Sequence, residues 1–148
     1  MREADHILIP LLDETFALAQ VARIEWGRTR IMILISDRSS ARTTKAKAIP
    51  ADAIVAAAIV SSDAVQPEQW PVIGYDAVPR IAGYHDLYLA GEDPIAPAIV
   101  EAFATALHGL YPWDGFPDPD FFTNMLRDPE VLPAKARMTS DFPKPESP

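Results

Sequence analysis

The residues with the most chemical potential lie between positions 108 and 122, where a histidine, three aspartates and five aromatic side chains fall within fifteen positions. His108 and Asp114 could exchange a proton, because imidazole and carboxylate groups are common general acids and bases. Together with Asp118 they could also hold a hard cation that activates a water molecule. This segment is therefore the first candidate for an active site, that of a small metal-assisted hydrolase.

The other parts of a catalytic apparatus are missing from the sequence. The histidines His6, His85 and His108 form no metal-binding pair, and neither a His-Glu-x-x-His motif nor a Gly-x-Ser-x-Gly elbow occurs. Six scattered glycines cannot form a phosphate-binding loop, and the absence of cysteine excludes thiolate chemistry and disulfides. We therefore predict no catalytic residue, no metal ligand and no cofactor, and keep the His108/Asp114/Asp118 hydrolase as the alternative.

Several residues of the 108–122 segment have a structural role that competes with chemistry. His108 is placed to close a helix, where the helix dipole favours an imidazole, and Asp118 before a proline is typical of the start of a helix. The aromatic side chains between them then either clasp onto the body of the protein or face a partner. The residues predicted to form this clasp or partner-binding surface are Tyr111, Trp113, Asp114, Phe116 and Asp118.

The net charge of −8 narrows the class of partner. It disfavours direct binding to nucleic acid, which needs clustered basic side chains, and it favours a basic protein partner. The basic residues at 38–47 lack interleaved aromatics and are predicted to form a solvated loop. The longest apolar run, Ala53–Val60, is far below the ~20 residues of a membrane span, and Met1–Asp5 has no signal-peptide core. We expect a cytoplasmic protein that contacts no membrane.

Strands are predicted to dominate the first half of the chain. Short turns separate three runs rich in β-formers, which predicts an antiparallel meander over residues 7–12, 16–26 and 30–36. Pro10 cannot donate a ladder hydrogen bond, so the first strand is expected to lie at an edge or to bulge there. Two further short strands are expected at 57–62 and 70–75.

Helices are predicted to follow the strands. Asp93-Pro94 is typical of a helix start, and apolar residues at helical spacing continue to Gly109, which ends the helix. The stripe comprises Ile95, Ile99, Phe103, Leu107 and Leu110. A second helix is predicted to begin at Asp118-Pro119. The architecture is thus α+β, an antiparallel β-meander or partly closed barrel of about five strands followed by two C-terminal helices. It forms one domain over residues 1–138, with a flexible tail at 139–148.

Short motifs in the first half of the chain also match a pattern of hydrophobic strands and tight turns. The matching residues are Asp5, Ile9-Pro10-Leu11, Asp13, Phe16 and Gln20-Val21, followed by Ile31–Ser36 and by Trp70-Pro-Val-Ile-Gly74. They make residues 4–80 resemble the immunity protein 26 family of bacterial polymorphic toxin systems. Ala4, Glu14 and Ala19 stand where that family usually has glycine.

The resemblance implies a β-rich protein without enzymatic activity that neutralises a cognate toxin by binding it. The family supplies no catalytic residues. The acidic charge fits a basic toxin such as a nuclease. We therefore expect an immunity protein that acts as an inhibitor through protein–protein binding. The alternatives are the hydrolase described above and a regulatory domain that binds a protein other than a toxin. The oligomeric state is left open.

Overall fold

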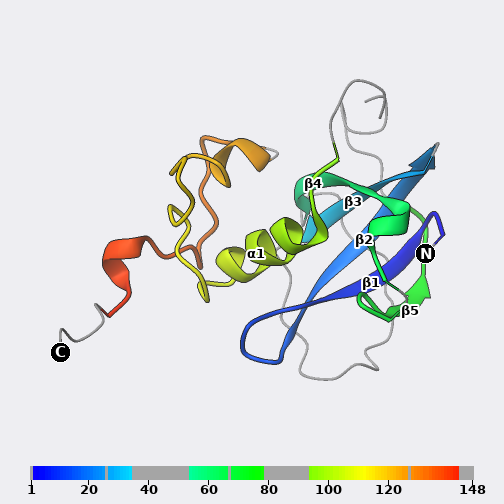
Figure 1. Ribbon diagram of the computed structural model, residues 1–148, viewed down its shortest axis with the longest axis horizontal. Coiled ribbons are helices and arrows are strands. Elements are labelled where there is room, and N and C mark those ends of the chain that lie inside the picture. Colours follow the sequence, from blue (N-terminus) through cyan, green and yellow to red (C-terminus); the bar gives the residue numbers. More distant parts are fainter. Residues whose placement is uncertain are drawn as a thin grey trace.

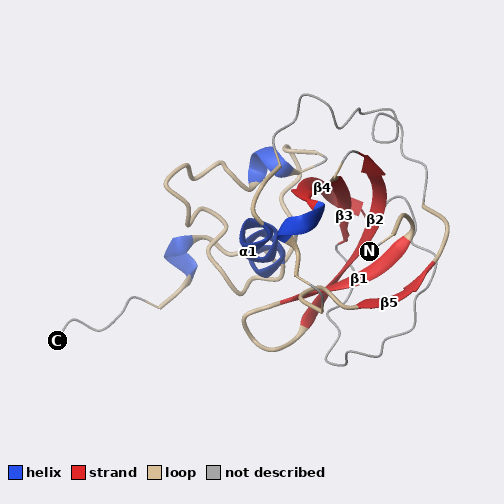
Figure 2. Ribbon diagram, turned by 45° about the vertical axis from the view of Figure 1, so that its right-hand side comes forward, coloured by secondary structure: helices blue, strands red, loops and turns tan. Residues whose placement is uncertain are grey.

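The computed structural model describes residues 2–25, 27–34, 54–66, 68–78, 94–126 and 128–143. These residues have an α+β fold, in which an antiparallel sheet packs against helix α1 and against the irregular chain that follows this helix (Figures 1 and 2). The predicted α+β class is therefore confirmed.

The sheet has the strand order β4-β3-β2-β1-β5, and every neighbouring pair is antiparallel. Its strands are β1 (Asp5–Pro10), β2 (Phe16–Glu25), β3 (Arg28–Leu34), β4 (Ile54–Ser61) and β5 (Val72–Tyr75). The meander of β1, β2 and β3 was predicted correctly. The partly closed barrel was wrong, because β4 and β5 lie at opposite edges of the sheet and do not pair with each other.

Pro10 lies in an inner strand, with β2 on one side and β5 on the other, and the bulge in β1 falls at His6/Ile7. The amide of Leu8 donates to the carbonyl of Pro71 at 2.9 Å, on the β5 side. Amides two residues apart in a strand point the same way. The nitrogen of Pro10 therefore faces the β5 side beyond the end of β5, where no hydrogen bond is lost.

Helix α1 (Pro97–Leu107) begins later than Asp93-Pro94 predicts. Asp93 lies outside the described residues. The amide of Ile95 donates to the carbonyl of Ile59 at 2.8 Å, so the chain is still bonded to β4 at this point. Pro97 then occupies the first turn, where its fixed φ suits a helix and its missing N–H costs nothing.

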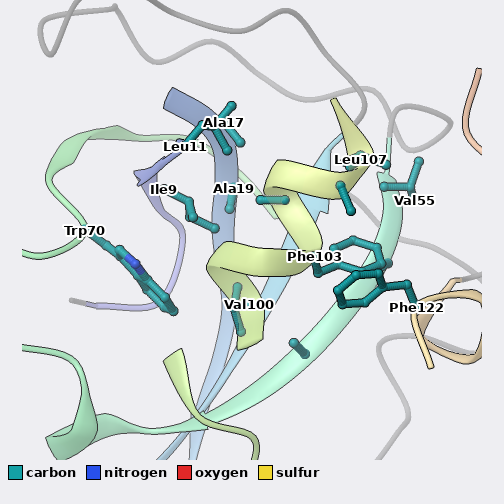
Figure 3. Packing of buried hydrophobic residues seen from close by; sticks show 14 of the residues in the cluster. Ile9, Leu11, Ala17, Ala19, Val55, Trp70, Val100, Phe103, Leu107 and Phe122 are labelled. Atoms are coloured by element: carbon teal, nitrogen blue, oxygen red, sulfur yellow. The ribbon is translucent and has the colours of Figure 1, made fainter. Parts of the chain in front are cut away.

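The core lies between α1 and one face of the sheet. Val100, Phe103, Ala104 and Leu107 are the helix residues that face it, at the i, i+3, i+4, i+7 spacing of an apolar stripe. Figure 3 shows Phe103 against Phe122 and shows Ala17 and Ala19 of β2 beside the helix. The predicted stripe was shifted, because Ile95 precedes α1 and Ile99 is only half-buried and lies outside this core.

The predicted second helix is absent from the described chain. Residues 118–126 form successive turns, with a single 3-10 turn at Thr123–Met125. The carboxylate of Asp118 accepts the amide of Asp120 at 2.9 Å, a local turn that competes with a helix. Leu126 is then extended, with ψ of 145°, to form a bridge with Ala56 of β4. This pairing with β4 requires an extended chain at Leu126, so the helical turn that precedes it does not continue.

The turn between β1 and β2 contains a strained residue. Glu14 has φ of 67°, in the left-handed region that costs a side chain about 1–2 kcal/mol. We expect Glu14→Gly to raise the free energy of unfolding by about 0.5–1 kcal/mol, measured by urea denaturation, because glycine removes the strain but loses more chain entropy on folding. Glu14→Ala keeps the β-carbon and serves as control. Equal stabilisation by both variants would contradict a backbone origin.

The face of the sheet opposite α1 contains two buried polar side chains, His6 of β1 and its cross-strand neighbour Gln20 of β2. The Gln20 amide nitrogen donates to the carbonyl of Ala4 at 3.1 Å and to that of Asp76 at 2.8 Å. Among the residues that the structure describes, neither ring nitrogen of His6 has a hydrogen-bond partner. Burial lowers the pKa of His6 below its ordinary 6.5, against the opposing influence of the Asp76 and Asp5 carboxylates.

A lowered histidine pKa means that the unfolded chain binds a proton more readily than the folded one. Stability should therefore decrease as the pH falls below 6.5, by at most about 1.4 kcal/mol per pH unit from this group. We expect His6→Leu to flatten the pH dependence of the free energy of unfolding between pH 7 and 5. An unchanged slope in the variant would assign the dependence to other groups.

Candidate functional site

The segment at 108–122 is packed onto the protein. Trp113 is 2% exposed, and its ring lies 5.5 Å from that of Phe103 and 5.6 Å from that of Phe122. The centroid of the Phe116 ring lies 4.6 Å from that of the Phe122 ring. The indole N–H of Trp113 donates to the hydroxyl of Thr123 at 3.0 Å. These residues form an aromatic clasp against α1, the first of the two roles proposed for the segment.

The polar residues of the segment are engaged separately. His108 is 5% exposed and occupies the C-terminal cap of α1, Asp114 bonds to Thr139, and exposed Asp118 bonds to the nearby backbone. Across the described ranges, no group of three or more His, Asp or Glu side chains is placed to hold a metal ion. The three residues of the hydrolase alternative thus have different structural partners.

Asp114 ties the end of the described chain to the clasp. Its Oδ1 accepts the amide of Thr139 at 2.6 Å and the hydroxyl of the same residue at 2.7 Å. Nearby, the amide of Trp113 donates to the carbonyl of Arg137 at 2.7 Å. Residues 139–143, assigned to the tail by sequence, include a 3-10 turn at Thr139–Asp141, whereas 144–148 lie outside the described residues.

These bonds lower the pKa of Asp114, first through the Thr139 hydroxyl and then through its amide. The tie is therefore complete above the ordinary aspartate pKa and is lost as the pH falls through the lowered value. We expect Asp114→Ala to accelerate tryptic cleavage after Arg137, measured at neutral pH by mass spectrometry. Asp118→Ala removes a carboxylate that bonds only locally and should leave this rate unchanged. Equal rates in both variants and the wild type would contradict the tie.

A groove of about 330 Å³ lies between the β1–β2 turn and α1. The turn contributes Pro10, Leu11 and Leu12, and α1 contributes alanines and two polar residues. Leu12 is 73% exposed, the greatest exposure of any aliphatic side chain among the exposed large apolar residues of the described chain. The rim of the turn also carries the exposed carboxylates of Asp13 and Glu14. The groove is therefore apolar in its walls and acidic at its margin.

Glu101 of α1 is the charged side chain among the described residues that line this groove. Its Oε1 accepts the indole N–H of Trp70 at 3.0 Å and the side-chain Nε2–H of Gln69 at 3.3 Å. Trp70 is 3% exposed, so its ring lies in the core while its N–H is satisfied at the rim of the groove. These two donors hold the Glu101 carboxylate in one position.

Tyr111 belongs to both the aromatic clasp and the groove, because its ring packs against Phe116 and Phe122 and the residue also lines the groove. Of the five predicted clasp or partner-binding residues, Tyr111 is the one that lines this groove. Trp113 is in the core, Phe116 packs among the aromatic rings, and Asp114 and Asp118 hold turns of the backbone.

The groove was missed from sequence, although two signals point to it. Leu12 stands at the tip of a tight turn, where polar residues are usual. Ala98 and Ala102 lie one helical turn apart, so two small side chains leave space along one face of α1. These features form a groove only because the fold places the β1–β2 turn beside α1.

Comparison of the chain with models of protein families, with curated proteins and with solved structures finds no match. The class of protein is therefore defined by the fold alone, an α+β protein with an open antiparallel sheet. None of its described helices has the length and apolar character needed to cross a membrane.

Proposed function

We propose that the protein is a non-catalytic binding module that neutralises a protein toxin by forming a complex with it. The observation that carries this proposal is the groove beside α1, where the exposed side chain of Leu12 adjoins a preformed depression lined by Glu101. An exposed leucine beside a groove with apolar walls offers apolar surface that a protein partner can bury. The net charge of −8 accelerates encounter with a basic toxin such as a nuclease.

The backbone supports the family resemblance on which the toxin partner rests. The immunity protein 26 family usually has glycine at the positions of Ala4, Glu14 and Ala19. Ala4 has φ of 75° and Glu14 has φ of 67°, which are conformations that glycine adopts without strain. Ala19 is fully buried beside α1, where a small residue lets the helix approach the sheet (Figure 3). Glycine would therefore fit the backbone at positions 4 and 14 and the packing at position 19.

The proposal is tested by co-expressing the protein with the product of each neighbouring gene. We expect one such product to arrest bacterial growth alone, and we expect the protein to restore growth and to co-purify with it. Leu12→Ser should weaken both effects. Leu132→Ser replaces another exposed leucine outside the groove, 46% exposed, and serves as the matched control.

Two outcomes would count against this function. Failure to bind or to suppress any neighbouring product would reject a toxin partner encoded nearby. A neighbouring product that binds without being toxic would instead identify a regulatory domain, the alternative that uses the same kind of surface without a toxin.

A further inference from the structure

We infer that the groove receives a cationic side chain, arginine or lysine, carried by a short apolar segment of the partner. This inference rests on the proposed function, because it assigns the chemistry of the partner at the same surface. The length of the groove, the state of its carboxylate and the character of its walls support this inference.

The length of the groove suits a short extended segment. On α1 its lining runs from Ala98 to Thr105. Seven residues of helix rise by about 10 Å, and an extended chain covers about 3.3 Å per residue. The groove thus matches roughly three residues of extended chain. An occupant of this length can lay one central side chain against the middle of α1, where Glu101 lies.

The carboxylate of Glu101 selects a cation. Its Oε1 is held by Trp70 and Gln69, whereas Oε2 has no hydrogen-bond partner within the described ranges. The lining as described includes neither lysine nor arginine. A purely apolar occupant would cover this charge without compensating it, and an anionic occupant would be repelled. A guanidinium or ammonium group instead forms a charge-assisted hydrogen bond to a carboxylate that Trp70 already positions.

The walls of the groove suit the rest of such a side chain. Arginine and lysine carry an aliphatic stem that packs on apolar surface while the charged end seeks a polar partner. Pro10, Leu12 and Ala102 offer that surface along the groove. Tyr111 also lines the groove, and its hydroxyl has no hydrogen-bond partner in the described part of the chain, so this hydroxyl is free to accept an N–H from the occupant. A forked guanidinium has enough donors for both oxygens.

The probe is a set of short fluorescent peptides with apolar flanks and arginine, lysine or citrulline at the centre. Citrulline has nearly the shape of arginine without its charge. We expect the arginine and lysine peptides to bind at least about tenfold more tightly than the citrulline peptide, measured by fluorescence polarisation at low salt. E101Q keeps an acceptor for Trp70 and should abolish this preference. E130Q removes an exposed charge outside the groove and should preserve it.

Equal binding of the three peptides, or a preference that survives E101Q, would overturn the inference. The melting temperature of E101Q, compared with that of the wild type, shows whether the variant remains folded. The two proposals fail separately. A toxin complex that forms equally well with E101Q and Leu12→Ser would leave the function standing and reject the groove. Peptide binding with the expected preference, in the absence of any toxin partner, would support the groove and reject the proposed function.

Discussion

Replacing Trp113 with alanine is expected to lower the free energy of unfolding by about 3–5 kcal/mol, the range for large aromatic residues in cores. The reason lies in its position, because the indole is 2% exposed and lies between the rings of Phe103 and Phe122. Its removal leaves a cavity between α1 and the chain at 122–123. Guanidinium or urea denaturation measures the effect directly.

Two further variants separate the parts of this effect. Trp113→Phe keeps a ring against Phe103 but loses the hydrogen bond to Thr123, and Thr123→Val removes the same bond from its other end. Each should cost less than the alanine variant, and a single hydrogen bond contributes only about 1 kcal/mol. A stable Trp113→Ala variant that failed to bind a partner would contradict the structural role and return the clasp to the binding surface.

Among substitutions that add a single methyl group to a described residue, Gly109→Ala is expected to cause the largest loss of stability. Gly109 has φ of 76°, which costs an alanine about 1–2 kcal/mol. A β-carbon there would also lie 2.6 Å from the carbonyl oxygen of Lys135, and this backbone must move to admit it. Overpacking adds about 1–3 kcal/mol to the cost. We expect a fall in the free energy of unfolding, and faster proteolysis of the segment at 135–142.

Gly27 provides the matched control for this prediction. Its φ of 75° gives the same backbone strain, but a β-carbon at Gly27 meets no heavy atom of the described residues within 4 Å, apart from its chain neighbours. Gly27→Ala should therefore show the conformational cost alone, and the difference between the two variants measures the contact with Lys135. Equal losses of stability in the two variants would show that the backbone at Lys135 moves away from the added β-carbon at no cost in free energy.

Local signals predicted the parts of the fold that depend on neighbouring residues. Gly109 was expected to end the helix, and it does so with two hydrogen bonds characteristic of a glycine cap, from its own amide to Ala106 and from Leu110 to Thr105. The meander of β1, β2 and β3 followed from β-rich runs separated by short turns. In both cases the decisive contacts lie within a few residues of the signal.

Contacts between distant residues decided the rest. Asp118-Pro119 is a sound helix start, yet the bridge of Leu126 to Ala56 in β4 straightens the chain after one turn. The apolar residues of α1 also fit a stripe that starts at Ile95, but the hydrogen bond from Ile95 to Ile59 keeps this residue with β4, and the helix begins at Pro97. The groove needs the β1–β2 turn beside α1, and no spacing along the chain encodes that proximity. Pairings of this kind cannot be derived from one sequence.

The two hydrogen bonds donated by the Gln20 side chain affect how the sheet opens. The carbonyl of Ala4 accepts both the Gln20 side chain and the amide of Asp76, while the amide of Ala4 donates to Val21. Ends of a chain usually fray in small independent openings that let amide hydrogens exchange with solvent. Here release of Ala4 or Asp76 must also release a fully buried side chain of β2. Their amide hydrogens should therefore exchange with deuterium at the rate of the centre of the sheet, so that β1 and β5 open together with β2 as one unit.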